Sequence, residues 1–90
     1  MFECQIDGRL CVLSRDALND LQRNGISHFT LREIIEHGED YRDAKMGRGE
    51  LGRCMIVKNE VLFTKLVPIY SFSLDEEVWL VKHVGKGKLK

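Results

Sequence analysis

The chain lacks several features that would define its class directly. Its 90 residues carry 14 Lys and Arg against 14 Asp and Glu, so the formal net charge is zero and polycation behaviour of the whole chain is excluded. No apolar run approaches the roughly 18 residues needed to cross a bilayer, and no basic segment followed by a hydrophobic one opens the chain. We therefore expect a cytoplasmic protein with no membrane partner.

Cysteine and proline are also scarce. Because Cys4, Cys11 and Cys54 are an odd number in a chain without an export signal, we expect reduced thiols rather than a disulfide framework. Cys4 and Cys11 are not a close Cys-x-x-Cys pair, so small buried hydrophobic side chains are favoured over a zinc site. The sequence predicts no metal and no cofactor. Pro68, the single proline, cannot donate a ladder hydrogen bond and is expected at a sheet edge or bulge.

The remaining composition is that of a small globular protein. With 43% hydrophobic and 31% charged residues, the chain predicts one domain, residues 1–84, whose modest core makes a homodimer a reasonable expectation. Residues 85–90 read Gly-Lys-Gly-Lys-Leu-Lys and have no acidic partner nearby in the sequence. They predict a basic flexible tail, which either improves solubility or binds phosphates.

Strand patterns occur at both ends of the chain. The Asp7-Gly8 pair lies between the apolar runs 2–6 and 10–13 and predicts an N-terminal β-hairpin. Residues 39–52 show little apolar periodicity and predict a loop. The strands of an antiparallel meander are then predicted at residues 54–57, 61–71 and 78–84.

Two short helices are predicted between the hairpin and the loop. Ser14 can cap the first helix, and Gly25 can end it in the left-handed conformation. The second helix begins at Ser27 or, through a capping box, at Thr30, and Gly38 ends it. The grouped order of elements indicates an α+β domain: two short helices packed on a three- to four-stranded antiparallel sheet, with an N-terminal β-hairpin.

Three short stretches carry a resemblance to a known family: Ser14-Arg15-Asp16-Ala17, Asn24-Gly25-Ile26-Ser27 and Gly38-Glu39. They resemble the pattern of the small domains grouped as domain-of-unknown-function family 4258, which opens with Ser-x-His-Ala, continues to Arg-Gly-Ile-Ser and reaches Gly-Glu. The resemblance covers the middle third of the chain. The family's histidine is Asp16 here, and its arginine is Asn24.

The resemblance implies the helices-then-sheet layout of RelE-like toxins and related small ribonucleases. It also implies an RNA groove between the sheet and the loop that precedes it, and an antitoxin-like partner protein. In such a groove, basic residues would hold RNA phosphates while a histidine or tyrosine acts as general acid or base.

His83 is the candidate for proton transfer, because an imidazole titrates near neutral pH. Strand alternation places Lys82 and His83 on opposite sides, so at most one of them points into a given groove. Trp79 is expected in the core and not as a base-stacking platform. The candidate phosphate-binding residues are Lys45, Arg48, Arg53, Lys82, Lys86 and Lys88. Solvated loop charge is the competing interpretation of the cations at residues 45–53.

Two hypotheses follow. The first is RNA binding with metal-independent ribonuclease activity of the RelE-like toxin type, in which His83 transfers protons. The second is a non-enzymatic module that homodimerises through its apolar final strands and binds a protein partner. Loss of RNA cleavage in a His83→Ala variant distinguishes them.

Overall fold

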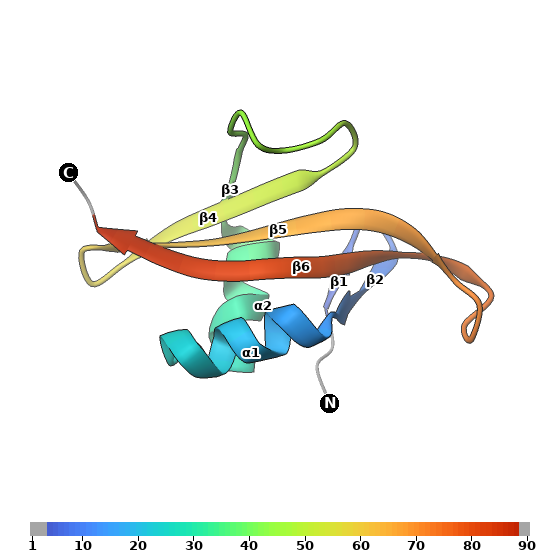
Figure 1. Ribbon diagram of the computed structural model, residues 1–90, viewed down its shortest axis with the longest axis horizontal. Coiled ribbons are helices and arrows are strands. Elements are labelled where there is room, and N and C mark those ends of the chain that lie inside the picture. The colour runs from blue at the N-terminus through green and yellow to red at the C-terminus, as the bar shows by residue number, and fades with distance from the viewer. Residues whose placement is uncertain (1–3, 89–90) are drawn as a thin grey trace.

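Two helices and one six-stranded sheet make up residues 4–88, the part of the chain that the computed structural model describes (Figure 1). Of Lys88 only the backbone is described. The elements are β1 (Gln5–Ile6), β2 (Arg9–Leu13), α1 (Arg15–Asn24), α2 (His28–His37), β3 (Glu39–Tyr41), β4 (Leu51–Val57), β5 (Glu60–Ser71) and β6 (Glu76–Lys88). The strand order is β1-β2-β6-β5-β4-β3.

The N-terminal hairpin joins the main sheet. Asp7 and Gly8 have φ values of 52° and 81°, which suits a two-residue turn and confirms the predicted hairpin. Residues 2 and 3 of the predicted first strand lie outside the described residues. After the turn, β2 pairs in parallel with β6, with Leu13 opposite Val81. The α+β class is confirmed, but the sheet is mixed and six-stranded, because β2 covers the edge of the apolar β6.

Both helices begin where a serine caps them. The Ser14 hydroxyl accepts a hydrogen bond from the Ala17 amide, and Gly25 ends α1 with φ 65°, as predicted. The Ser27 hydroxyl accepts from the amide of Thr30, so the earlier of the two predicted starts of α2 is observed.

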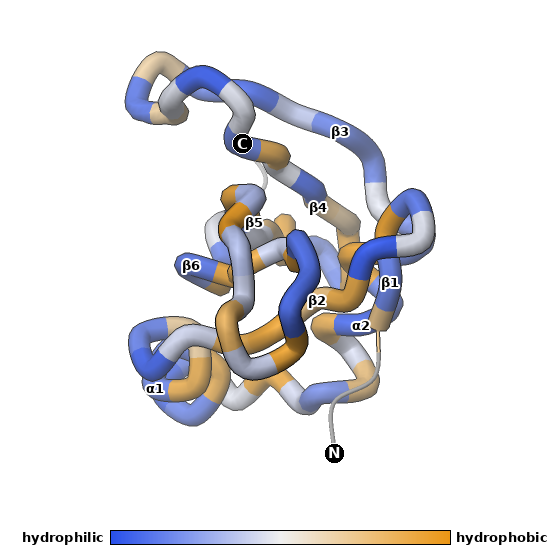
Figure 2. Tube along the Cα trace, turned by 90° about the vertical axis from the view of Figure 1, so that its right-hand side faces the viewer, coloured by the Kyte–Doolittle hydropathy of each residue, from blue (hydrophilic) through white to orange (hydrophobic). Residues whose placement is uncertain are grey.

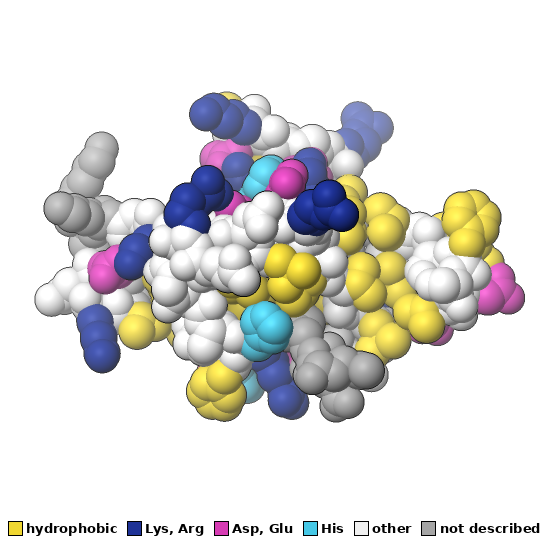
Figure 3. Space-filling view, turned by 60° about the horizontal axis from the view of Figure 1, so that its bottom comes forward, with side chains coloured by type: hydrophobic (Ala, Val, Ile, Leu, Met, Phe, Trp, Pro, Cys, Tyr) yellow, Lys and Arg dark blue, Asp and Glu magenta, His cyan; other side chains and the backbone are white. Residues whose placement is uncertain are grey.

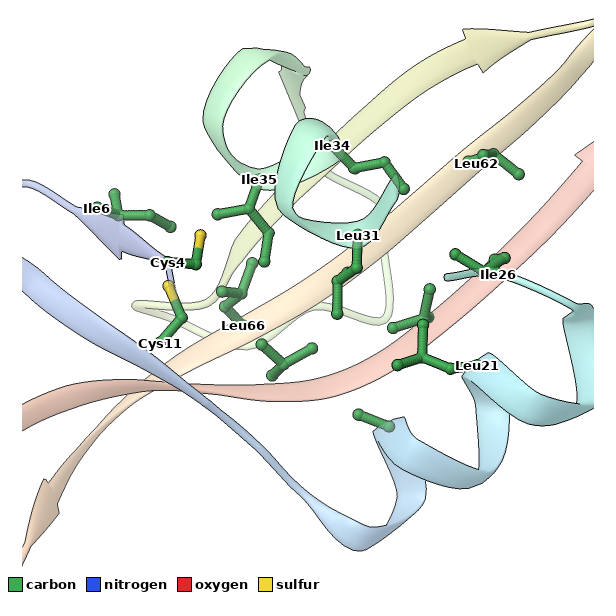
Figure 4. Packing of buried hydrophobic residues seen from close by; sticks show 13 residues of the cluster. Cys4, Ile6, Cys11, Leu21, Ile26, Leu31, Ile34, Ile35, Leu62 and Leu66 are labelled. Carbon is green, nitrogen blue, oxygen red and sulfur yellow. The ribbon is translucent and has the colours of Figure 1, made fainter. Parts of the chain in front are cut away.

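The core lies between the helices and one face of the sheet. Leu31, Ile34 and Ile35 of α2 are fully buried and face Leu66 of β5 (Figure 4). Figure 2 shows hydrophobic positions gathered where the helices meet the strands, whereas β3 and the connection after it are mostly hydrophilic. The alternate strand residues, whose side chains point away from this core, therefore form the opposite face of the sheet.

Two predicted boundaries are corrected by strand pairing. The predicted loop 39–52 contains β3 and the start of β4, so the irregular segment is residues 42–50. The predicted flexible tail is also wrong for residues 85–88, which continue β6 and pair with β5, with Gly85 opposite Phe63. The glycine there makes room for an aromatic ring: a Cβ on Gly85 would lie 2.6 Å from the Phe63 ring. Residues 89 and 90 lie outside the described residues.

The β5–β6 hairpin extends beyond its neighbours. Pairing of β4 with β5 stops at Leu66, and pairing of β2 with β6 covers only Trp79 to Val81. Residues 69–78 therefore form a two-stranded projection, called the arm below (Figure 1). Pro68 lies at the base of the arm, on the side where β4 has ended, which agrees with its predicted position at a sheet edge.

Candidate functional site

Asp20 of α1 is buried against the open edge of β6. Its Oδ2 accepts a hydrogen bond of 3.0 Å from the Val84 amide, at a position that β2 does not reach. The Asn24 side chain donates to the carbonyls of Asp20, at 2.9 Å, and of Val84, at 3.5 Å. Side chains of α1 thus supply hydrogen bonds that a neighbouring strand would otherwise make.

The same carboxylate holds two cationic or titratable side chains at the surface. The Nδ1 atom of His83 lies 3.5 Å from Asp20 Oδ2, and the guanidinium of Arg23 pairs with Oδ1. The His83 side chain is 52% exposed, whereas that of Asp20 is 9% exposed. A fixed carboxylate orients an imidazole for proton transfer, and a guanidinium binds phosphate oxygens. Sequence reasoning missed Asp20 and Arg23, since Asp20 is placed by Val84 and His83, which lie more than sixty residues away in the chain.

Arg53 does not share a surface with His83. Strand pairing places Arg53 in one row with Thr64 and Val84 on the helix-facing side of the sheet, whereas His83 pairs with Lys65 on the opposite face. The Arg53 side chain is largely buried, donates to the carbonyl of Ile35 at 2.9 Å and lies 2.6 Å from a carboxylate oxygen of Asp40. Arg53 therefore joins α2, β3 and β4, and its guanidinium is engaged by these contacts.

The other predicted phosphate-binding residues are dispersed. Lys82 pairs with Glu50 at 3.0 Å, and Lys86 pairs with Glu60 at 3.7 Å. Lys45 and Arg48 lie exposed in the segment 42–50. The side chain of Lys88 lies outside the described residues.

Two ion pairs hold the segment 42–50 against the sheet face opposite the helices. Asp43 pairs with Lys65 at 2.9 Å, and Glu50 pairs with Lys82. Met46, which lies between Asp43 and Glu50 in the sequence, is buried. Hydrogen bonds from these lysines lower the pKa of the Asp43 and Glu50 carboxyl groups. The groove implied by the family resemblance, between the sheet and this segment, is therefore bridged by charged contacts.

The tip of the arm carries exposed apolar side chains. Figure 3 shows them as a group at the end of the molecule formed by the β5–β6 hairpin. They are Ile69, Tyr70, Phe72 and Leu74. Phe72 is 91% exposed, and its ring meets the Tyr70 ring edge-on at 5.2 Å. The sequence predicted homodimerisation through the apolar final strands, and in β6 Val78 and Val81 are fully buried within the protein.

Within residues 4–88, no helix is long and apolar enough to cross a bilayer. Comparisons of the chain with protein-family models, with curated proteins and with solved structures find no match.

Proposed function

We propose that the protein binds RNA at the surface around His83 and cleaves it without a metal ion, as its resemblance to domain-of-unknown-function family 4258 implies. One observation carries this proposal: a half-exposed imidazole contacts a buried carboxylate that also holds a guanidinium. The sheet scaffold fixes Asp20 through the Val84 amide, so the pair does not depend on a mobile loop.

The chemistry assigned to His83 is proton removal from a ribose 2′-hydroxyl. With Nδ1 directed at Asp20, Nε2 is the nitrogen left to accept this proton. The 2′-oxygen then bonds to the adjacent phosphorus, the bond to the 5′-oxygen breaks, and that oxygen takes a proton from water. The products are a 2′,3′-cyclic phosphate and a 5′-hydroxyl. Arg23 would neutralise the phosphate, and Lys45 and Arg48 would add salt-dependent affinity.

The test is cleavage of single-stranded and structured RNA by the purified chain in the presence of a chelator. We expect cyclic-phosphate products and a rate at least ~100-fold lower in His83→Ala. His37→Ala is the matched control, because His37 is also exposed and also contacts a carboxylate, that of Glu33. Intact RNA that is not retained at low salt would contradict the proposal.

A second function is favoured by the arm: a module that homodimerises and binds protein. Its exposed aromatic tip is typical of a contact surface and unusual for a monomer. Of the acidic residues beside the tip, Glu77 pairs with Arg9 and the Asp75 carboxylate accepts a hydrogen bond from the Tyr70 hydroxyl.

Sedimentation velocity tests this second function. We expect the unaltered chain to dimerise and the double variant Phe72→Ser/Leu74→Ser to be monomeric at the same concentration. Phe29→Ser is the matched control, because Phe29 is 70% exposed but lies on α2, away from the arm. A dimer that survives in the double variant would exclude the arm as its interface.

A further inference from the structure

Cys4 and Cys11 face each other across the N-terminal hairpin. The register of β1 and β2 places them directly opposite, and the Cys11 amide donates to the Cys4 carbonyl at 2.9 Å. Figure 4 shows the two side chains next to each other at the edge of the core. They are 3% and 4% exposed, and both thiols are free in this structure.

The geometry suits a bond between the two sulfur atoms. Opposite residues that exchange a backbone hydrogen bond in an antiparallel pair have Cα atoms about 5.5 Å apart. This separation lies inside the range of roughly 4.4–6.8 Å that disulfides span. The two thiols also share a hydrogen bond, so their sulfur atoms already face each other.

The two thiols differ in acidity. The hydrogen bond from Cys11 lowers the pKa of Cys4, because it stabilises a thiolate there. The same bond raises the pKa of Cys11, and burial raises it further. Cys4 is therefore the thiol that would react first.

We propose that Cys4 and Cys11 form a dithiol that small disulfides, such as oxidised glutathione, convert to an intramolecular disulfide. The Cys4 thiolate attacks one sulfur of the small disulfide and releases one thiolate, which leaves a mixed disulfide at Cys4. Cys11 then loses its proton and attacks the Cys4 sulfur, which releases the second small thiol. Two protein thiols are oxidised, and one small disulfide is reduced to two thiols.

The position of the pair in the fold gives the oxidant a route to it. β1 has two residues and is the outermost strand of the sheet, so it opens at a lower free-energy cost than the central strands. The disulfide would tie Cys4, the residue before β1, covalently to β2, and β1 itself lies against α2. Cys54, on β4, stays free. This inference is independent of RNA binding.

The experiment equilibrates the full chain in glutathione buffers of increasing oxidised fraction, then alkylates free thiols with iodoacetamide and measures the intact mass. We expect three alkylated cysteines under reducing conditions and one, Cys54, under oxidising conditions. Peptide mapping should find Cys4 bonded to Cys11. The Cys54→Ser variant should show the same midpoint with no thiol left to alkylate after oxidation.

A Cys11→Ser variant provides the second measurement. It should stop at the mixed disulfide and retain one glutathione on Cys4, which a reductant removes. The proposal is overturned if all three cysteines remain alkylatable across the series, or if oxidation adds glutathione to the unaltered chain without linking Cys4 to Cys11.

Discussion

At the scale of single residues, Asp20 has the most consequential contacts. Its carboxylate is buried and satisfies the Val84 amide, and it also holds Arg23 and His83. A buried amide that loses its acceptor costs the full desolvation of that group. Asp20 therefore supports both the attachment of α1 and the candidate site.

We predict that Asp20→Ala lowers the free energy of unfolding by about 2 kcal/mol, measured by urea denaturation. Glu33→Gln is the control, because Glu33 makes only a surface contact with His37 and should change stability by less than about 0.5 kcal/mol. Equal effects in the two variants would mean that the Val84 amide finds another partner.

Tyr41 gives a prediction on alkaline stability. Burial raises its pKa to about 12, with a further contribution from the Asp43 carboxylate. Because the raised pKa disfavours the phenolate in the folded state, this contribution is complete below pH 10 and is lost as the pH rises through 12. In an absorbance titration, Tyr41→Phe should remove a transition near pH 12, and its stability should fall less steeply above pH 10. An unchanged alkaline profile would contradict this assignment.

At the scale of elements, β6 shows how a strand accommodates its neighbours. Two glycines, Gly85 and Gly87, lie in the part of β6 that pairs with β5. A Cβ on Gly85 would meet the Phe63 ring, whereas nothing lies within 4 Å of one on Gly87. The two glycines look alike in the sequence and differ only in what packs above them.

We predict that Gly85→Ala destabilises the protein by roughly 1–3 kcal/mol, because the Phe63 ring must move out of its position. Gly87→Ala, two residues along the same strand, should be neutral within about 0.5 kcal/mol. Thermal unfolding of both variants measures the difference. Similar Tm values for the two variants would mean that the Phe63 ring moves without a cost in stability.

At the scale of the whole molecule, β6 continues to Lys88, beyond residue 84, where the sequence predicted the end of the domain. Truncation after Val84 removes the part of β6 that pairs with residues 60–63 of β5. The buried Leu62 would lose its pairing with Lys86, so we expect a loss of about 2 kcal/mol or more in urea denaturation. Truncation after Lys88, which removes only residues 89 and 90, is the control for shortening the chain. A flexible tail, as the sequence predicted, would leave the stability of both truncated chains unchanged.

Part of the candidate site could be predicted from the sequence. His83 was identified from its residue type alone, because few side chains titrate near neutral pH. Arg53 was assigned to the same site because it is basic and lies near the glycine-rich segment, but strand alternation places it on the other face. Asp20 had no sequence signal beyond its charge, since its burial depends on where β6 passes α1.

The sequence by itself determined the local turns, helix starts and helix ends of this protein. The turn at Asp7 and Gly8, the Ser14 cap and the left-handed Gly25 depend on interactions between residues a few positions apart. Only the tertiary structure decided the parallel pairing of β2 with β6, the two faces of the sheet and the meeting of Asp20 with His83. The β2–β6 pairing and the Asp20–His83 contact each join residues more than sixty positions apart. Whether such contacts form depends on how the whole chain buries its apolar surface.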